Sequence, residues 1–390
     1  MLEKALTGNR GYFLWIAFLL IVGGVGFSSY LKQLSTGLGI TGMSRDVSWG
    51  LYIGQFTFLV GVAASAVMLV MPYYLHNYKV FGKITILGEF LAVASVTMCL
   101  SFIIVDLGRP DRAFNVLLYP TPNSVLFWDM VVLNGYLFLN IIIGWTVLGA
   151  EGRGAPPPAW VKPLIYLSIP WAISIHTVTA FLYAGLPGRG FWLTAIMAPR
   201  FLGSAFASGP ALLILFCLFL RKFTKFDAGW TAIQSLAKIV AYAIVASIFF
   251  FLCEIFTVYY SQIPEHTYHF DYLLAGLHGH SALTPWMWAC IIMALAGAAL
   301  MVIPATRHSE QILPIGCVLV FLSLWIEKGI SLVVTGFIPS PLETLTEYAP
   351  TLREMSITLG IWALGFLILT ILYKVAIAVR LSEGPLAVEH

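Results

Sequence analysis

Charged side chains are scarce in this sequence. Asp, Glu, Lys and Arg make up 10% of its 390 residues, and 59% are hydrophobic, whereas soluble domains carry about 25% charged residues. The scarcity excludes an ordinary soluble protein, and a net charge of +3 predicts no nucleic-acid partner. The apolar runs are continuous rather than alternating, which disfavours a membrane β-barrel. The sequence therefore predicts an all-α polytopic membrane protein.

Cysteine and membrane-embedded histidine are also scarce. The five cysteines form no CxxC pair, so no iron–sulfur cluster or zinc ribbon is expected within this chain. A b-type haem needs axial ligands such as helix-borne histidines, and only His176 lies well within an apolar run. We therefore expect no haem. His266, His269, His278 and His280 gather in one loop, where they predict either a metal site or, as we prefer, a hydrogen-bonded lid without metal.

Ten apolar runs are long enough to cross a bilayer, which takes about 20 helical residues. We expect a single membrane domain over 1–390, with transmembrane helices near 12–32, 49–74, 85–106, 125–149, 164–185, 201–220, 239–262, 286–305, 313–337 and 355–376.

Lysine and arginine set the predicted orientation. With the N-terminus inside, thirteen fall in inner segments and seven, including Arg200, in outer ones, which by the positive-inside rule places both termini in the cytoplasm. We therefore expect a multi-pass protein of the cytoplasmic (inner) membrane. The segments 150–162 and 221–238 are the predicted long inner connectors.

Ionisable residues inside spans are the first functional candidates, because a charge at a helix centre costs about 2.5–3.5 kcal/mol on an insertion scale. Glu89, Glu254 and Glu327 are candidates for a proton pathway, as isolated carboxylates on separate helices. Glu327 and Lys328 are adjacent, so they are expected to point in different directions and to need separate partners.

The outer half of the first five helices predicts a pocket. Tyr52 and Gln55 share a helix face at i,i+3 spacing, with Trp49 just before them. Asp129 and His176 are expected at the same depth. Aromatic, amide, carboxylate and imidazole groups between apolar walls suit a quinone headgroup, which needs hydrogen-bond partners and a titrating group.

Two further features border this pocket. Asp106 and Arg109, three residues apart at a helix end, predict either site residues or an i,i+3 ion pair. Trp128, Trp192 and Trp286 fall near outer helix ends, where aromatic side chains anchor in the interface; we expect that role for Trp192 and Trp286.

Three motifs resemble the NrfD/PsrC family of membrane subunits. Asp106-Leu-Gly-Arg-Pro-Asp-Arg112, followed by Trp128-Asp129, is similar to its DLGRPxR…NPxSxxxW stretch, and Ser-Ile-His176-Thr-Val with Gly203–Gly209 to its SxHTVV…GAxxSG segment. The run from Glu347 to Glu354 is most similar to the ten-helix branch, which includes DsrP of the DsrMKJOP complex, called HmeB in the Hdr-like menaquinol oxidoreductase.

The resemblance implies a haem-free subunit of an anaerobic respiratory complex, linked to dissimilatory sulfur metabolism. Such a subunit exchanges electrons between menaquinol and an extracytoplasmic four-cluster ferredoxin-like iron–sulfur subunit. The implied further partners are a cytochrome c subunit, a membrane cytochrome b-type subunit and cytoplasmic Hdr-like iron–sulfur subunits. The implied quinone-site residues are Trp49, Asp106, Arg109, Trp128-Asp129 and His176.

The mechanism that we expect has His176 or Asp129 accepting a proton from menaquinol, with Tyr52 and Gln55 orienting the ring. Two other functions stay open. Ten helices with buried acids also suit a proton-coupled secondary transporter, and the chain could be a non-catalytic membrane anchor of its complex.

Overall fold

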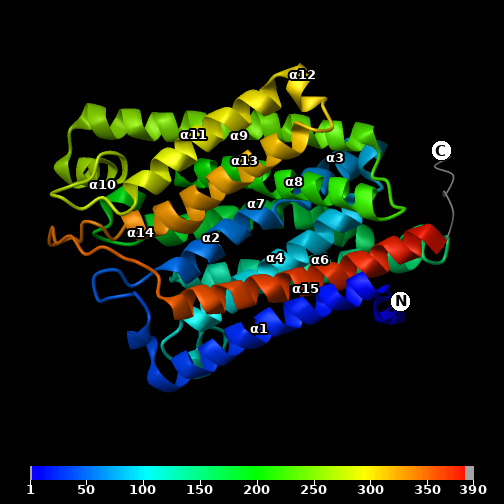
Figure 1. Cartoon of the computed structure of the whole chain (residues 1–390), viewed down its shortest axis with the longest axis horizontal. Coiled ribbons are helices and arrows are strands. Elements are labelled where there is room, and N and C mark those ends of the chain that lie inside the picture. Colours follow the sequence, from blue (N-terminus) through cyan, green and yellow to red (C-terminus); the bar gives the residue numbers. More distant parts are fainter. Residues whose placement is uncertain (1, 383–390) are drawn as a thin grey trace.

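The structure, a computed structural model, describes residues 2–382. Within that range ten helices are long and apolar enough to cross a membrane, which confirms the predicted number and makes the chain a multi-pass membrane protein. Figure 1 shows them running side by side, with their loops at the two ends of the bundle. They are α1 (Arg10–Thr36), α2 with α3 (Leu51–Ala63, Val67–Leu75), α4 (Thr85–Asp106), α6 (Val125–Glu151), α7 (Val161–Ala184), α8 (Met197–Phe223), α9 (Trp230–Ser261), α11 (Thr284–Val302), α13 with α14 (Leu313–Ile326, Val333–Thr335) and α15 (Leu352–Ser382).

The helix boundaries lie within four residues of the predictions except at the start of α9 and at the end of α15, which extends to Ser382 rather than 376. The limits of α4 are those predicted, whereas α8 begins at Met197 rather than 201 and α9 at Trp230 rather than 239. A proline in the first turn of a helix is tolerated because its missing N–H has no helical acceptor there, so Pro199 does not delay α8. The connector predicted over 221–238 is wrong: only residues 224–229 are non-helical, because α9 extends beyond its apolar part.

The helices pack in two groups, with a further pair at the side. In the first group α2 packs on α4, α4 on α6, and α6 on α7. In the second, α8 packs on α9 and α13, and α11 on α13. α2 and α7 join the groups by contacting α8. α1 and α15 pack on each other, and α15 also packs on α4.

One spanning helix changes its winding partway. Between α13 and α14, the segment η6 (Glu327–Leu332) is a π-helix, and it packs against α2. A π-helical turn leaves backbone carbonyls without their usual α-helical donors and is frequent at functional sites. The short helices α5 (Asn115–Leu118), α10 (Pro264–Leu274) and α12 (Pro304–Arg307) lie in the connections.

Candidate functional site

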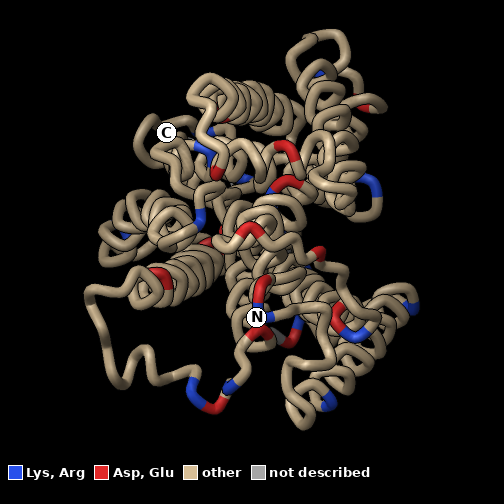
Figure 2. The backbone as a smooth tube through the Cα atoms, turned by 90° about the vertical axis from the view of Figure 1, so that its left-hand side faces the viewer, with Lys and Arg blue, Asp and Glu red and all other residues tan. Residues whose placement is uncertain are grey.

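Buried polar side chains gather at one end of the bundle, the left-hand end in Figure 1. They lie in the first or last few turns of their helices, within about 12 Å of the helix end at about 1.5 Å per residue. They include Gln33, Tyr52, Gln55, Asp129, His176, Arg200, Glu254, Glu327 and Glu354. Figure 2 looks onto this end, where most of the tube is uncharged. These nine buried polar side chains thus lie near one membrane surface.

Asp129 and His176 belong to neighbouring helices. Asp129, one turn into α6, is 2% exposed, and Thr179 Oγ1 on α7 donates a hydrogen bond to its Oδ1 over 2.6 Å. His176 lies one turn before Thr179 and is fully buried; neither of its ring nitrogens has a hydrogen-bond partner among the described residues. A neutral imidazole can accept a proton at one nitrogen and donate at the other. The two helices therefore hold an anchored carboxyl group and an imidazole with both nitrogens available.

Tyr183 connects this pair to α2. Its hydroxyl hydrogen-bonds Thr57 Oγ1. Because the Thr57 hydroxyl itself donates to the Ile53 carbonyl over 2.7 Å, Tyr183 is the donor. The carboxyl groups of Asp129 and Asp106 both interact electrostatically with the Tyr183 hydroxyl. A polar seam thus crosses the first helix group from α6 to the end of α4.

At the other side of this seam, α1 joins the site. Tyr52 donates from its hydroxyl to Gln33 Oε1 over 2.8 Å, and Gln33 Nε2 donates to the Val105 carbonyl over 2.6 Å. Asp106 follows Val105, and its buried Oδ1 has no hydrogen-bond partner within residues 2–382. Asp106 and Glu354 both interact electrostatically with Tyr52. Two acids therefore lie beside the Tyr52–Gln33 pair.

Gln55 makes different contacts from Tyr52, although both are buried. Its Oε1 accepts hydrogen bonds from the indoles of Trp325 and Trp362, over 2.9 and 3.1 Å, and its Nε2 donates to the Gly329 carbonyl over 3.3 Å. Gly329 belongs to η6. The amide thus ties α2 to the π-helix and to α15. To orient a quinone ring, as predicted, Gln55 would have to give up some of these hydrogen bonds.

Trp49 lies in an aromatic cluster above Tyr183. Its ring centroid is 5.7 Å from that of Tyr183, 6.0 Å from Trp192 and 5.8 Å from Phe337. The prediction that Trp192 anchors in the interface is wrong: the side chain is fully buried, and its indole donates to the Leu332 carbonyl of η6 over 2.9 Å. One backbone acceptor satisfies the single polar group of an indole, which makes burial possible.

Arg109 and Trp128 lie at the surface. Arg109 Nη2 is 3.0 Å from Asp111 Oδ2, with its side chain 66% exposed, so the predicted Asp106–Arg109 pair is wrong. Helix α4 ends at Asp106 and the next residue is extended, and i,i+3 pairing needs a continuing helix. Trp128 is 48% exposed and donates to the Pro122 carbonyl over 2.8 Å.

A second buried cluster lies in the other helix group. Arg200 on α8 binds Glu254 of α9, and its Nη2 is 2.6 Å from Glu327 Oε1 on η6. Lys328 Nζ is 3.6 Å from the same Glu327 oxygen and 4.3 Å from the centroid of the Phe201 ring. Two cations and two carboxylates are thus brought together, which offsets the large cost of burying each charge alone.

This cluster corrects three expectations. Arg200 is a buried helical residue rather than an outer-loop charge. Glu254 and Glu327 are not isolated, because both bind Arg200. Glu327 and Lys328 share a contact instead of diverging, and they do so where the chain winds as a π-helix, whose wider turn changes the angle between successive side chains.

Glu89 lies at the opposite end of the bundle. It is seventeen residues before Asp106 on α4, which is about 26 Å along the helix axis. It is buried, and its Oε2 accepts no hydrogen bond from the part of the chain that the structure describes. The same oxygen faces α6, 3.1 Å from the position that a Cβ would take at Gly144.

The histidine-rich loop is held by hydrogen bonds. His269 on α10 is buried, and its Nδ1 lies 2.9 Å from the Thr335 carbonyl and 2.8 Å from the Ile338 carbonyl. Burial lowers the pKa of His269 below its ordinary value. His280 Nδ1 is 3.4 Å from Glu347 Oε2. Among the described side chains, no three His, Cys, Asp or Glu group together as metal ligands.

The sequence did not predict a place in these networks for five buried residues: Gln33, Thr179, Tyr183, Arg200 and Glu354. Thr179 and Tyr183 follow His176 at i+3 and i+7, on the same helix face, so spacing could have revealed them. Gln33 falls one residue beyond the predicted 12–32 helix. The partners of Arg200 lie more than 50 residues away, and no local pattern signals them.

Several known membrane subunits are similar to this chain in sequence. One subunit of the selenate reductase of Mesobacillus selenatarsenatis is 26% identical over 68% of this chain and 69% of its own length. The Hdr-like menaquinol oxidoreductase integral membrane subunit of Archaeoglobus fulgidus is 26% identical over 61% and 58%. The menaquinone reductase integral membrane subunit of Nitratidesulfovibrio vulgaris is 21% identical over 93% and 91%. Residues 39–339 match the family model described as polysulphide reductase, NrfD. The chain therefore belongs to the NrfD family of membrane proteins.

Proposed function

We propose that this chain is the haem-free, menaquinone-interacting membrane subunit of a respiratory redox complex. It exchanges electrons between menaquinol and an extracytoplasmic four-cluster iron–sulfur subunit, in a complex of dissimilatory sulfur metabolism related to DsrMKJOP. The observation that carries the proposal is the polar seam of Asp129, Thr179 and Tyr183, buried between apolar helices near one membrane surface, together with the buried Oδ1 of Asp106 at the end of α4. Two of the relatives are named as menaquinol or menaquinone enzymes.

The residues of the seam fit a quinone headgroup. Such a ring needs partners for two oxygens and a group that takes up its protons. Both His176 nitrogens and Asp106 Oδ1 are buried without a hydrogen-bond partner among the described residues, so these atoms are free to bind it. Menaquinol, when bound, supplies two electrons and two protons.

The side chains of this site have separate roles in the proposal. His176 accepts a proton at a ring nitrogen, and Asp129 accepts one at the carboxyl oxygen that Thr179 leaves free. Tyr52, Asp106 and Trp49 orient the ring. Gln55 could help to orient the ring, as predicted, only by giving up some of its three existing hydrogen bonds. The apolar helices around the site exclude water, which strengthens each electrostatic contact.

The surface at this end suits a docked subunit. The segment 107–124 carries exposed apolar side chains beside Arg109 and Trp128; they include Phe114, Leu118 and Tyr119, which are more than two-thirds exposed. Large exposed apolar patches mark interaction sites. We assign this surface to the iron–sulfur subunit, with the N- and C-termini on the cytoplasmic side of the inner membrane. The cytochrome c, cytochrome b-type and Hdr-like subunits complete the proposed complex.

The test uses the intact complex and its quinol-dependent reduction of the clusters. We expect Asp129→Asn and His176→Ala each to slow this reduction by about 100-fold, the lower range for loss of an acid–base group. Asp227→Asn and Ser168→Ala, away from the site, serve as controls and keep the wild-type rate. Normal reduction in both site variants would refute the assignment. Absence of any quinol-dependent reduction in the assembled wild-type complex would favour a membrane anchor, or a transporter if proton-coupled uptake were found.

A further inference from the structure

We propose that α1, α4 and α15 form a binding groove for the isoprenoid tail of the quinone, a second part of the site that leads to Gln33 and Asp106. The inference rests on the proposed function and extends it to helices that the family match does not include, because residues 39–339 leave out both α1 and α15.

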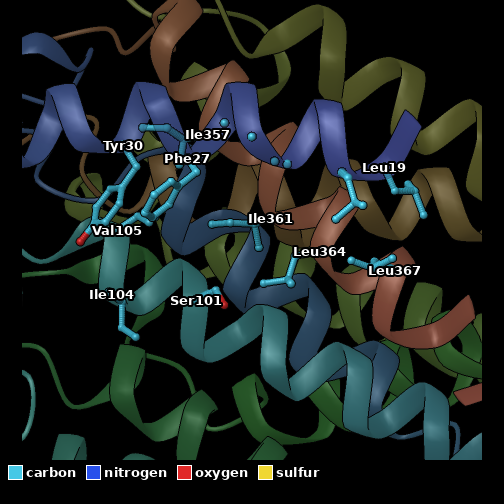
Figure 3. Close-up of a pocket in the computed structure, with 15 residues that line it drawn as sticks. Leu19, Phe27, Tyr30, Ser101, Ile104, Val105, Ile357, Ile361, Leu364 and Leu367 are labelled. Atoms are coloured by element: carbon cyan, nitrogen blue, oxygen red, sulfur yellow. The ribbon is translucent and has the colours of Figure 1, made fainter. Parts of the chain in front are cut away.

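The groove is apolar and elongated. Its volume is about 410 Å³, and Figure 3 shows side chains of α1, α4 and α15 lining it. On α1 the lining runs from Leu19 to Tyr30, which lie eleven residues apart and thus about 16 Å along the helix. On α15 it runs from Ile357 to Leu367. A channel of this shape fits an extended hydrocarbon chain rather than a compact ligand.

Glycines on α1 keep the groove open. A Cβ added at Gly23 or Gly24 would meet no described atom within 4 Å, and both glycines line the groove. Gly26 has the opposite role, because a Cβ there would lie 2.6 Å from Gly360 Cα on α15. The two helices therefore touch at Gly26, and the Ser29–Ser356 hydrogen bond of 3.0 Å fixes them to each other one turn further on. This contact fixes the width of the groove beside Gly23 and Gly24.

One end of the groove is polar. Tyr30 lines both the groove and a smaller hollow bounded by Gln33, Gly108 and Pro110. Gln33 bonds the Val105 carbonyl, and the next residue, Asp106, keeps a buried Oδ1 without a partner in residues 2–382. The apolar groove therefore leads to hydrogen-bonding groups at this end.

The charge at this end selects the occupant. The residues that line the groove and the hollow include no Lys or Arg. A phospholipid phosphate would therefore be buried there without a cation to pair with, which is costly. A quinone has a neutral headgroup with two hydrogen-bonding oxygens, and its tail is hydrocarbon. Its tail matches the apolar groove, and its headgroup matches the polar end of the groove.

The direct test is photolabelling of the complete complex in native membranes, with a menaquinone that carries a diazirine in its tail. We expect labelled peptides from α1, α4 and α15. Gly23→Phe fills the groove and should reduce this labelling about tenfold, the effect of losing contact with about two methylene groups. Ile21→Phe, on the lipid-facing side of α1 and outside the groove, is the matched control and keeps it.

Kinetics separate this proposal from the proposed function. In Gly23→Phe the KM for long-tailed menaquinol should rise about tenfold, with turnover of a tail-less naphthoquinol unchanged. A wild-type KM for both quinols in Gly23→Phe, or labelling of the groove by a diazirine phospholipid but not by the menaquinone, would overturn the groove alone. A wild-type complex that oxidises neither quinol would overturn the proposed function itself.

Discussion

Arg200 and Glu254 form an ion pair across α8 and α9 with both side chains almost fully buried. The same guanidinium also binds Glu327, so a single cation holds two carboxylates of two other segments. A second arginine of α8, Arg221, pairs at the surface with Glu310 of the connection before α13, at 3.1 Å, and so offers a comparison of buried and exposed charge.

The first prediction concerns Arg200→Met. The variant leaves the buried Glu254 without a cation and Glu327 with Lys328 alone, and breaking a buried pair costs about 3–5 kcal/mol. Arg221→Met removes an exposed pair and should cost at most about 1 kcal/mol. Thermal unfolding of the purified protein in detergent measures both. Equal losses in the two variants would show that the buried cluster does not hold the second helix group together.

The second prediction concerns Thr179→Val, which keeps the shape of the side chain but removes the hydrogen bond to Asp129. Losing a positioned bond of about 1.4 kcal/mol should slow quinol-dependent cluster reduction about tenfold. The effect should appear in kcat more than in KM, because Thr179 acts through Asp129. Thr179→Ser should restore the rate. Thr177→Val, whose hydroxyl bonds its own helix at Ile173, is the control, and a loss of rate there as large as in Thr179→Val would contradict the assignment.

The third prediction tests whether Gln55 stabilises the fold or binds the quinone ring. Gln55→Leu leaves the indoles of Trp325 and Trp362 without their acceptor. Each unsatisfied buried donor costs about 1–3 kcal/mol. We expect a clear fall in thermal stability and an unchanged KM for quinol. Gln234→Leu loses one bond, to the Arg307 carbonyl, and should be milder. A raised KM with normal stability would instead place Gln55 against the ring.

The fourth prediction concerns proton movement. Glu89 lies about 26 Å from Asp106 along α4, near the end opposite the seam. If the complex conserves energy through this chain, Glu89→Gln should lower the number of protons translocated per electron while quinol oxidation continues. Acidification by the reconstituted complex measures this ratio, with the exposed Glu310→Gln as control. An unchanged ratio would remove Glu89 from any proton pathway.

Hydropathy predicted the spans well and the contacts poorly, for physical reasons. The limits of α4 were predicted correctly because Lys83 and the Gly108–Pro110 turn bound its apolar run. Burial of Asp129 and His176 followed from their depth. The π-helical turn at Glu327 could not be predicted, because it depends on packing against α2. The burial of Arg200 could not be predicted either, because its partners Glu254 and Glu327 lie far from it in the sequence.

The packing of α1 against α15 also has a consequence for the folding of the protein in the membrane. Of the ten described spanning helices the first packs on the last, and the segment before α1 is tied to α15 by the Lys4–Ala378 hydrogen bond of 3.2 Å. Contacts so distant in sequence form late, since the intervening chain must be ordered first. The α1–α15 contact is therefore expected to form after the helices between them are in place, and a chain truncated before α15 would keep the seam but would not complete the groove beside α1.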